Sequence, residues 1–283
     1  MPKFRRSLSI GRDAFYAFLA DDGWAIASHV ALSGLMALFP FLLVLTALAA
    51  IFGSEHLADE AATLLIETWP EAVAGPIVLE IQSVLAGAHG GTLTIGALLA
   101  VYFSSSGIEG MRVALNRAYS MAEMRPWWLL RLESIGYVLV GATALLALAF
   151  LVVLAPLFWY TALRYAAWIE PFGWIVTFVR FAIASIVVVA ALVIVHLWLP
   201  AGRRRFSEVL PGVVVTLVLW LAAGHAFGRY LADFAFTYAF YYAGLSTPMI
   251  ALVFLYLIAA IFIYGGELNA VILRRRLERE PIR

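Results

Sequence analysis

Long apolar segments alternate with short polar ones along the whole chain. Six of these segments exceed the roughly twenty residues that a helix needs to cross the hydrocarbon core of a membrane. They cover residues 28–53, 93–115, 134–160, 174–199, 208–230 and 247–273. None of them alternates in polarity, which argues against membrane-spanning strands. The pattern predicts an all-α, polytopic membrane protein, a bundle of six transmembrane helices.

The positions of lysine and arginine orient this bundle. Sixteen of the 19 lie before the first span, in the last residues of the second or in the loop after it, after the fourth span or beyond the sixth. With an even number of spans, these regions share one side, and the positive-inside rule predicts that both termini are cytoplasmic. The expected organisation is a cytoplasmic tail with an interfacial helix over 1–27, a membrane domain over 28–273 and a basic cytoplasmic tail over 274–283.

Two amphipathic stretches flank the first span. Residues 54–92 contain six acidic residues and neither lysine nor arginine, and their apolar residues recur at helical spacing. We expect amphipathic helices on the exterior face, serving as a simple cap or as an outer gate or docking surface. Residues 13–24 mix aromatic and acidic side chains after three arginines, which predicts an interfacial helix on the anionic cytoplasmic leaflet.

The amino-acid composition limits the kinds of functional site that the chain can contain. The chain is 64% hydrophobic and 13% charged, with a mean hydropathy of +0.94, which a soluble fold could not bury. It has no cysteine, which excludes disulfides, thiolate metal sites and thiol nucleophiles. His29, His196 and His225 lie on different spans without metal-ligand spacing, and we interpret them as single histidines with satisfied hydrogen bonds. We expect no catalytic site, no metal and no cofactor.

Charged and polar residues inside the apolar segments are the candidate functional groups. Ser105, Glu109, Arg112 and Asn116 follow one another at spacings of 4, 3 and 4, so they share one face of the second span. Glu267 lies in the sixth span, and we expect it at a depth similar to that of Glu109, facing the bundle interior. Arg112 is the expected charge partner of Glu109. Such groups either lock helices together or line a polar or proton-coupled pathway that opens to the cytoplasm.

Three further features concern helix geometry. Asn269 is two residues beyond Glu267 and therefore faces another side of its helix. Gly265 and Gly266 predict close helix packing on the sixth span. Pro40 lies in the middle of the first span, where it removes a backbone donor and predicts a kink.

Several of these motifs together resemble the YihY/BrkB family of bacterial inner-membrane proteins. They are Leu38-Phe39-Pro40, Ala114-Leu115-Asn116-Arg117-Ala118-Tyr119, Leu199-Pro200, Pro211-Gly212 and Gly265-Gly266-Glu267-Leu268-Asn269-Ala270. Phe254 stands where the family pattern has tryptophan, and Ala243 separates Tyr242 from Gly244. The resemblance implies six helices with cytoplasmic termini and an envelope role, with proposed links to serum resistance and to export of lipid or lipopolysaccharide.

The same family carries an old label as ribonuclease BN, and the residues argue against that activity. A nuclease needs a clustered His/Asp metal site or a solvent-facing acid–base pair, together with a basic surface for nucleic acid. The dispersed arginines here are already explained by membrane insertion. We therefore expect neither an enzyme nor a nucleic-acid partner.

The functional expectation is a transporter or exporter of a lipid-like or amphipathic envelope solute in the bacterial inner membrane. The alternative is a non-transporting scaffold or envelope assembly factor. Membrane lipids are the expected partners in both cases. Transport predicts a polar-lined cavity that reaches Glu109 and Glu267, whereas a scaffold predicts a filled core. The sequence leaves open the solute, the coupling ion, the direction and the oligomeric state.

Overall fold

The computed structural model describes residues 3–51, 90–149, 167–242 and 246–278, with isolated positions between 150 and 166. Its elements are α1 (Lys3–Ala20), α2 (Gly23–Ile51), α5 (Gly90–Ala118), α6 (Trp127–Ala149), the 3-10 helix η2 (Ala167–Phe172), α8 (Gly173–Trp198), α9 (Phe206–Tyr242) and α10 (Ser246–Leu277). No strand occurs in these ranges. The all-α prediction is therefore confirmed. The expected exterior segment, apart from its last residues at the start of α5, lies outside the described residues.

Four helices of the described part are long and apolar enough to cross a membrane. The apolar stretches are Trp127–Leu145, Glu170–Trp198, Phe206–Ala232 and Thr247–Leu277, and each overlaps one of the last four expected spans. In α2, the shorter stretch Gly23–Leu38 is apolar. Helices α2 and α5 occupy the places of the first two expected spans. The chain is an all-α membrane protein, and the count of six spans stays a prediction.

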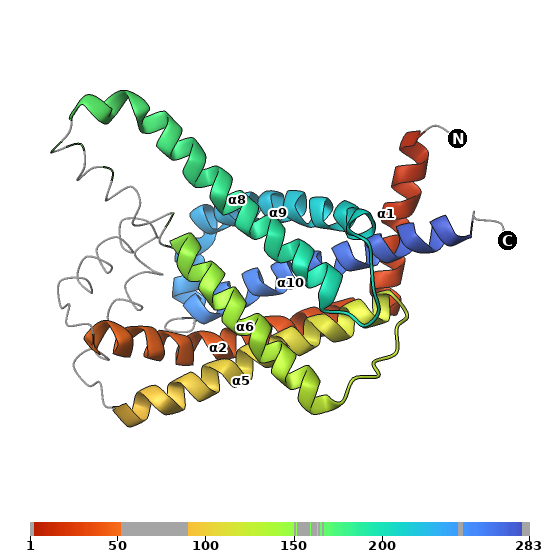
Figure 1. Cartoon of the computed structure of the whole chain (residues 1–283), viewed down its shortest axis with the longest axis horizontal. Helices are drawn as coiled ribbons and strands as arrows, with labels where there is room; N and C mark the ends of the chain where they lie inside the picture. Colours follow the sequence, from red (N-terminus) through yellow and green to blue (C-terminus); the bar gives the residue numbers. More distant parts are fainter. Residues whose placement is uncertain are drawn as a thin grey trace.

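Helices α2, α5, α9 and α10 form the packed centre of the molecule (Figure 1). Helix α2 packs along α5, and α10 packs against α2, α5 and α9. At Gly110 of α5, an added Cβ would lie 2.9 Å from His29 Cδ2 and 2.9 Å from Val30 Cγ2 of α2. A residue without a side chain is therefore what lets α2 and α5 approach so closely.

The contact between α9 and α10 is closer still. A Cβ added at Gly212 of α9 would lie 2.1 Å from the Gly265 carbonyl oxygen of α10. A Cβ added at Gly266 would lie 2.4 Å from Leu115 Cδ2 of α5. The predicted close packing at Gly265 and Gly266 is confirmed, with each glycine facing a different neighbour. Helix α2 continues through Pro40 to Ile51, so the proline does not end it, and the kink stays a prediction.

Helix α1 lies across one end of the bundle, where both termini are found (Figure 1). Its residues Ala14 and Phe18 are buried, whereas Leu8 and Tyr16 are exposed. The Tyr264 hydroxyl of α10 donates to the Gly11 carbonyl at 3.1 Å. Helix α1 therefore has one buried and one exposed face, and its interfacial role stays a prediction.

The basic segments meet at this same end. Arg117 Nη1 lies 2.9 Å from Asp22 Oδ2, which ties α5 to the turn between α1 and α2. Arg274 of α10 donates to the Ala118 carbonyl at the end of α5. Arg275 donates to Ser9 Oγ at 3.0 Å. The structure thus brings α1, the end of α5 and the end of α10 together at one end of the bundle, and the cytoplasmic location of this end stays a prediction.

Candidate functional site: an apolar cavity and two buried polar clusters

The predicted polar stripe on α5 is only partly interior. Ser105, Arg112 and Asn116 are buried, with relative exposures of 0%, 3% and 8%. The Glu109 side chain is 35% exposed and lies at the interface with α6. Three of the four residues are therefore buried, while the carboxylate lies at the edge of the α5–α6 contact.

Glu109 pairs with Arg131 of α6, because Arg131 Nη1 lies 2.9 Å from Glu109 Oε1. The Arg131 guanidinium also lies 4.6 Å from the ring centroid of Tyr102 and donates to the Tyr102 carbonyl at 3.2 Å. The expected Glu109–Arg112 pair is therefore wrong. Arg131 belongs to a helix that crosses α5, so the spacing of residues within α5 does not reveal this ion pair.

Arg112 turns toward α6 instead. Its Nη2 donates to the Leu130 carbonyl at 3.0 Å and to Ser134 Oγ at 2.5 Å. Ser134 is itself fully buried. The long Arg112 side chain thus joins α5 to α6 through hydrogen bonds to neutral oxygens.

Asn116 connects two loops at the charged end of the bundle. Its Nδ2 donates to Glu123 Oε2 at 3.1 Å, and its Oδ1 accepts from the Ala201 N–H at 2.7 Å. Arg125 lies 2.8 Å from Glu123 and 2.7 Å from Glu133. The hydrogen bonds from Arg125 lower the pKa of Glu123 to about 2. This cluster holds the loops after α5 and α8 against each other.

Glu267 has surroundings unlike those of Glu109. It is 0% exposed, and among the described residues neither of its carboxylate oxygens has a hydrogen-bond partner. The Asp21 carboxyl and the Arg274 guanidinium interact with it electrostatically. Glu267 is interior as expected, but its neighbours belong to the α1–α2 turn and to α10, whereas those of Glu109 belong to α6.

Asn269 binds the backbone of α9. Its Oδ1 accepts from the Gly212 N–H at 2.6 Å, and its Nδ2 donates to the Val209 carbonyl at 2.9 Å. Pro211 lies between these two residues and has no N–H to donate within the helix, and the two bonds from Asn269 help to hold this turn of α9 in place. The Pro211-Gly212 pair was the sequence signal for this contact, which periodicity alone does not reveal.

His196 is fully buried and less completely bonded than expected. Its Nδ1 lies 2.8 Å from the Leu192 carbonyl oxygen, and its ring packs on Phe262 at 4.7 Å between centroids. Its Nε2 has no hydrogen-bond partner among the described residues. No group of three or more potential metal-binding side chains occurs in the same part of the chain.

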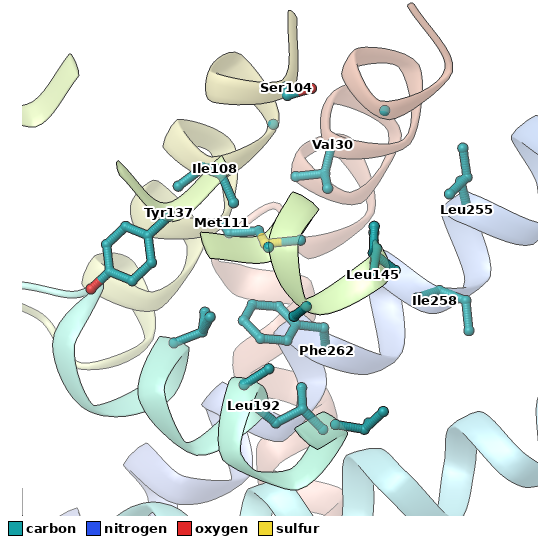
Figure 2. A pocket seen from close by; sticks show the side chains of 18 of the residues that line it. Val30, Ser104, Ile108, Met111, Tyr137, Leu145, Leu192, Leu255, Ile258 and Phe262 are labelled. Atoms are coloured by element: carbon teal, nitrogen blue, oxygen red, sulfur yellow. The ribbon is translucent and has the colours of Figure 1, made fainter. Parts of the chain in front are cut away.

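A cavity of about 510 Å³ lies between the helices, and side chains from α2, α5, α6, α8, α9 and α10 meet around it (Figure 2). Its wall is almost entirely apolar and includes Val30, Ile108, Met111, Leu145, Leu192, Leu255, Ile258 and Phe262. Ser104 and Tyr137 are among its few polar side chains. Neither Glu109 nor Glu267 lines it. The structure therefore matches neither sequence expectation: the cavity is not polar, and the core is not filled.

Sequence reasoning missed this cavity. Its signal was the concentration of small residues on facing helices, among them Gly34, Gly107, Gly141 and Ala191. A Cβ added at Gly141 would meet no atom within 4 Å. Small residues usually let helices approach each other closely, as at Gly110. The sequence alone therefore does not show whether a small residue lies at a helix–helix contact or beside a cavity.

Comparison with known proteins identifies the family. Residues 14–283 match the sequence profile described as Virulence factor BrkB. YfkH of Bacillus subtilis (strain 168), whose name calls it ribonuclease-like, is 24% identical over 95% of this chain and 97% of its own length. No solved structure matches.

Two further relatives are named UPF0761 membrane proteins. The one from Rhodospirillum centenum is 26% identical over 94% of this chain and 58% of its own length. The one from Xanthomonas oryzae pv. oryzae (strain PXO99A) is 25% identical over 98% of this chain and 64% of its own length. This chain thus spans less than two thirds of these relatives. Since the family profile covers nearly all of it, the chain belongs to the Virulence factor BrkB family of membrane proteins.

Proposed function

We propose that this chain is an inner-membrane protein with cytoplasmic termini that binds a lipid-like or amphipathic envelope solute in the apolar cavity and transports it. The observation that carries the proposal is the cavity itself. Its volume of about 510 Å³ falls in the range of about 300–1,000 Å³ that is usual for ligand sites. Hydrocarbon is the chemistry that such a lining favours.

The arrangement of α6 and α8 supports entry from the lipid phase. Both helices contribute to the cavity wall, yet they contact each other little. On α6, neither Gly136 nor Gly141 has an atom within 4 Å of an added Cβ. Two loosely joined walls are suited to admit an acyl chain sideways, whereas the polar end of such a solute would stay near the membrane surface.

Two glycines of α6 provide a matched test. Gly141 lines the cavity and Gly136 does not, although an added Cβ meets no atom within 4 Å at either position, so Gly141→Trp adds bulk at the cavity wall and Gly136→Trp adds it elsewhere on α6. Both proteins are purified and their bound lipids quantified by mass spectrometry. Both are then reconstituted into vesicles with a fluorescent phospholipid analogue, whose movement between leaflets is followed by quenching.

We expect Gly141→Trp to lose bound lipid and leaflet exchange, and Gly136→Trp to keep both. Equal lipid content in the two variants would overturn the cavity as the binding site. Bound lipid in the wild type without leaflet exchange would instead favour the scaffold, in which lipid only fills the bundle.

The proposed orientation has its own test, because the chain has no cysteine. A single cysteine replaces Glu67 in the expected exterior segment or Arg203, which is exposed in the loop before α9. An impermeant thiol reagent added outside intact cells should label position 67 only. Labelling of position 203 alone would reverse the topology.

The proposal includes no ribonuclease activity, in spite of the name of the Bacillus relative. The arginines at the charged end already bind protein groups, as Arg117 does with Asp22 and Arg125 with Glu123. Purified protein should leave RNA intact. Cleavage that disappears when one residue of this chain is substituted would refute this part of the proposal.

A further inference from the structure

The Arg125 side chain joins α6 to α8 at the charged end of the bundle. Arg125 lies two residues before α6 and donates from Nη1 to Glu133 Oε2 of α6 at 2.7 Å. From Nη2 it donates to the carbonyl oxygen of Leu199, the C-cap residue of α8, at 3.3 Å. One guanidinium thus links the first turns of α6 to the end of α8. These three residues form the α6–α8 junction.

Two further sets of hydrogen bonds hold the junction in place. Nε and Nη2 of Arg125 each donate to the Glu123 carboxylate at 2.8 Å. This is the bidentate arrangement that a planar guanidinium favours. The Ala201 N–H, just beyond α8, donates to Asn116 Oδ1 of α5 at 2.7 Å. The ends of α5 and α8 and the start of α6 are therefore fastened to one another.

The remainder of α6 is attached much less firmly. In the described part of the chain, the residues of α6 that form hydrogen bonds or ion pairs with other elements all lie in its first half. They are Leu130, Arg131, Glu133 and Ser134. Further along, the Thr143 hydroxyl bonds within its own helix. The second half of α6 is therefore held by apolar contacts.

Helix α8 shows the same change along its length. Its buried residues are Leu192, Val193 and His196, which lie in the last two turns before the junction. Nearer its start, Phe178 and Ile186 are exposed. Both helices are thus packed at the junction and exposed farther from it.

The cavity is open between these less firmly held segments. Three residues that line it are also exposed, namely Gly141 and Leu145 of α6 and Ala191 of α8. Leu145 is 65% exposed although its side chain belongs to the cavity wall (Figure 2). These three residues surround the opening of the cavity.

The opening lies at the same distance from the junction along both helices. Gly141 is eight residues beyond Glu133 on α6, which corresponds to about 12 Å. Ala191 is eight residues before Leu199 on α8, again about 12 Å. The two helices therefore resemble arms of equal length that are joined at the junction and free at the opening.

We propose that Arg125 is the pivot about which α6 and α8 separate, so that the acyl chain of a membrane lipid enters the cavity beside Gly141, Leu145 and Ala191. The inference rests on the proposed function, because it takes a lipid as the solute. Helices that are fixed at one end and little joined beyond it can swing as hinged bodies. The charged end of the cavity stays closed during this movement.

The test measures two distances between α6 and α8 in the full chain, which has no cysteine of its own. Spin labels on cysteines that replace Leu132 and Trp198 report on the junction. Labels at Leu139 and Ile186 report on the opening. All four side chains are exposed and none lines the cavity. Double electron–electron resonance gives the distance distributions in nanodiscs of phosphatidylethanolamine and phosphatidylglycerol.

We expect a narrow distribution at the junction and a broader one at the opening. Arg125→Gln should broaden the junction distribution and shift it to longer distances, because the charged fork that binds Glu133 and Leu199 is lost. The control Arg131→Gln breaks an ion pair between α6 and α5 and should leave the junction distribution unchanged. Equal widths at the two ends of the parent protein, or no change at the junction in Arg125→Gln, would overturn the proposal.

A second pair of variants keeps the test decisive if Arg125→Gln does not fold. Glu133→Gln weakens the link to α6 and should broaden the junction distribution. Glu123→Gln leaves Arg125 bound to both Glu133 and Leu199 and should keep it narrow. Equal distributions in these two variants would contradict the assignment of Arg125. The distances need no bound solute, so a lack of bound lipid would overturn the proposed function and not the pivot.

Discussion

The α9–α10 interface and the α5–α6 interface hold polar groups between helices in opposite ways. At the first, Asn269 binds the backbone of α9 directly, and Gly212 lies against the Gly265 carbonyl without room for a methyl group. At the second, the long side chains of Glu109 and Arg131 meet while 35% and 24% exposed.

This difference separates a rigid side of the molecule from an adaptable one. Backbone contacts allow one spacing of the helices only, because nothing at the interface can rotate away. Long charged side chains can follow a moving helix and remain paired. The adaptable interface also borders the cavity, since Ile108 and Met111 of α5 and Gly141 of α6 line it. If α6 moves to admit a solute, the Glu109–Arg131 pair can accompany it.

The largest loss of stability is expected for Gly212→Ala. The new Cβ would lie 2.1 Å from the Gly265 carbonyl oxygen and 2.4 Å from Asn269 Nδ2, so the two helices must separate. Overpacking of this kind costs about 1–3 kcal/mol or more. Gly136→Ala on α6 is the control, because it meets no atom within 4 Å and replaces a poor helix former. Thermal unfolding of both variants measures the contrast, and equal stability would remove the distinction between the interfaces.

Asn269→Ala is expected to cause the next largest loss of stability. It leaves the Gly212 N–H and the Val209 carbonyl without their side-chain partner in a buried place. Each unsatisfied group costs about 1–3 kcal/mol. Thr143→Ala on the exposed face of α6 removes a hydroxyl bonded only within its own helix and serves as the control. A loss in Asn269→Ala no larger than in Thr143→Ala, measured by thermal unfolding, would show that α9 does not need this help.

Glu109→Gln is expected to lower the free energy of unfolding by about 1 kcal/mol or less, because the Glu109–Arg131 ion pair that it breaks is partly exposed. Arg131 keeps its contacts with the Tyr102 ring and carbonyl. A double-mutant cycle with Arg131→Gln measures the coupling between the two side chains. A loss greater than that of Asn269→Ala would mean that the α5–α6 interface is as rigid as the α9–α10 interface.

The last prediction concerns acid and the loop after α5. Arg125 lowers the pKa of Glu123 from 4.5 to about 2. Because the folded-state pKa is depressed, this stabilisation is present above about pH 4.5 and is lost as the pH falls toward about 2. Unfolding at stepwise lower pH should show this loss in the wild type and not in Glu123→Gln. The same acid sensitivity in both proteins would assign it to another group.

Features that depend on one helix at a time were predictable. Hydropathy identified the membrane class, and the four described helices that are long and apolar enough to cross a membrane overlap expected spans. The spacing of Ser105, Arg112 and Asn116 predicted a buried face of α5, and all three are buried. These properties follow from residue type and the helical period, which are local.

Features that depend on how helices cross were not predictable. The partner of Glu109 comes from α6, and Asn269 binds the backbone of α9. The sequence by itself determined which residues avoid lipid, because that depends on their own polarity. Only the tertiary structure decided which of them meet and where a cavity remains, because crossing angles and side-chain directions set those distances.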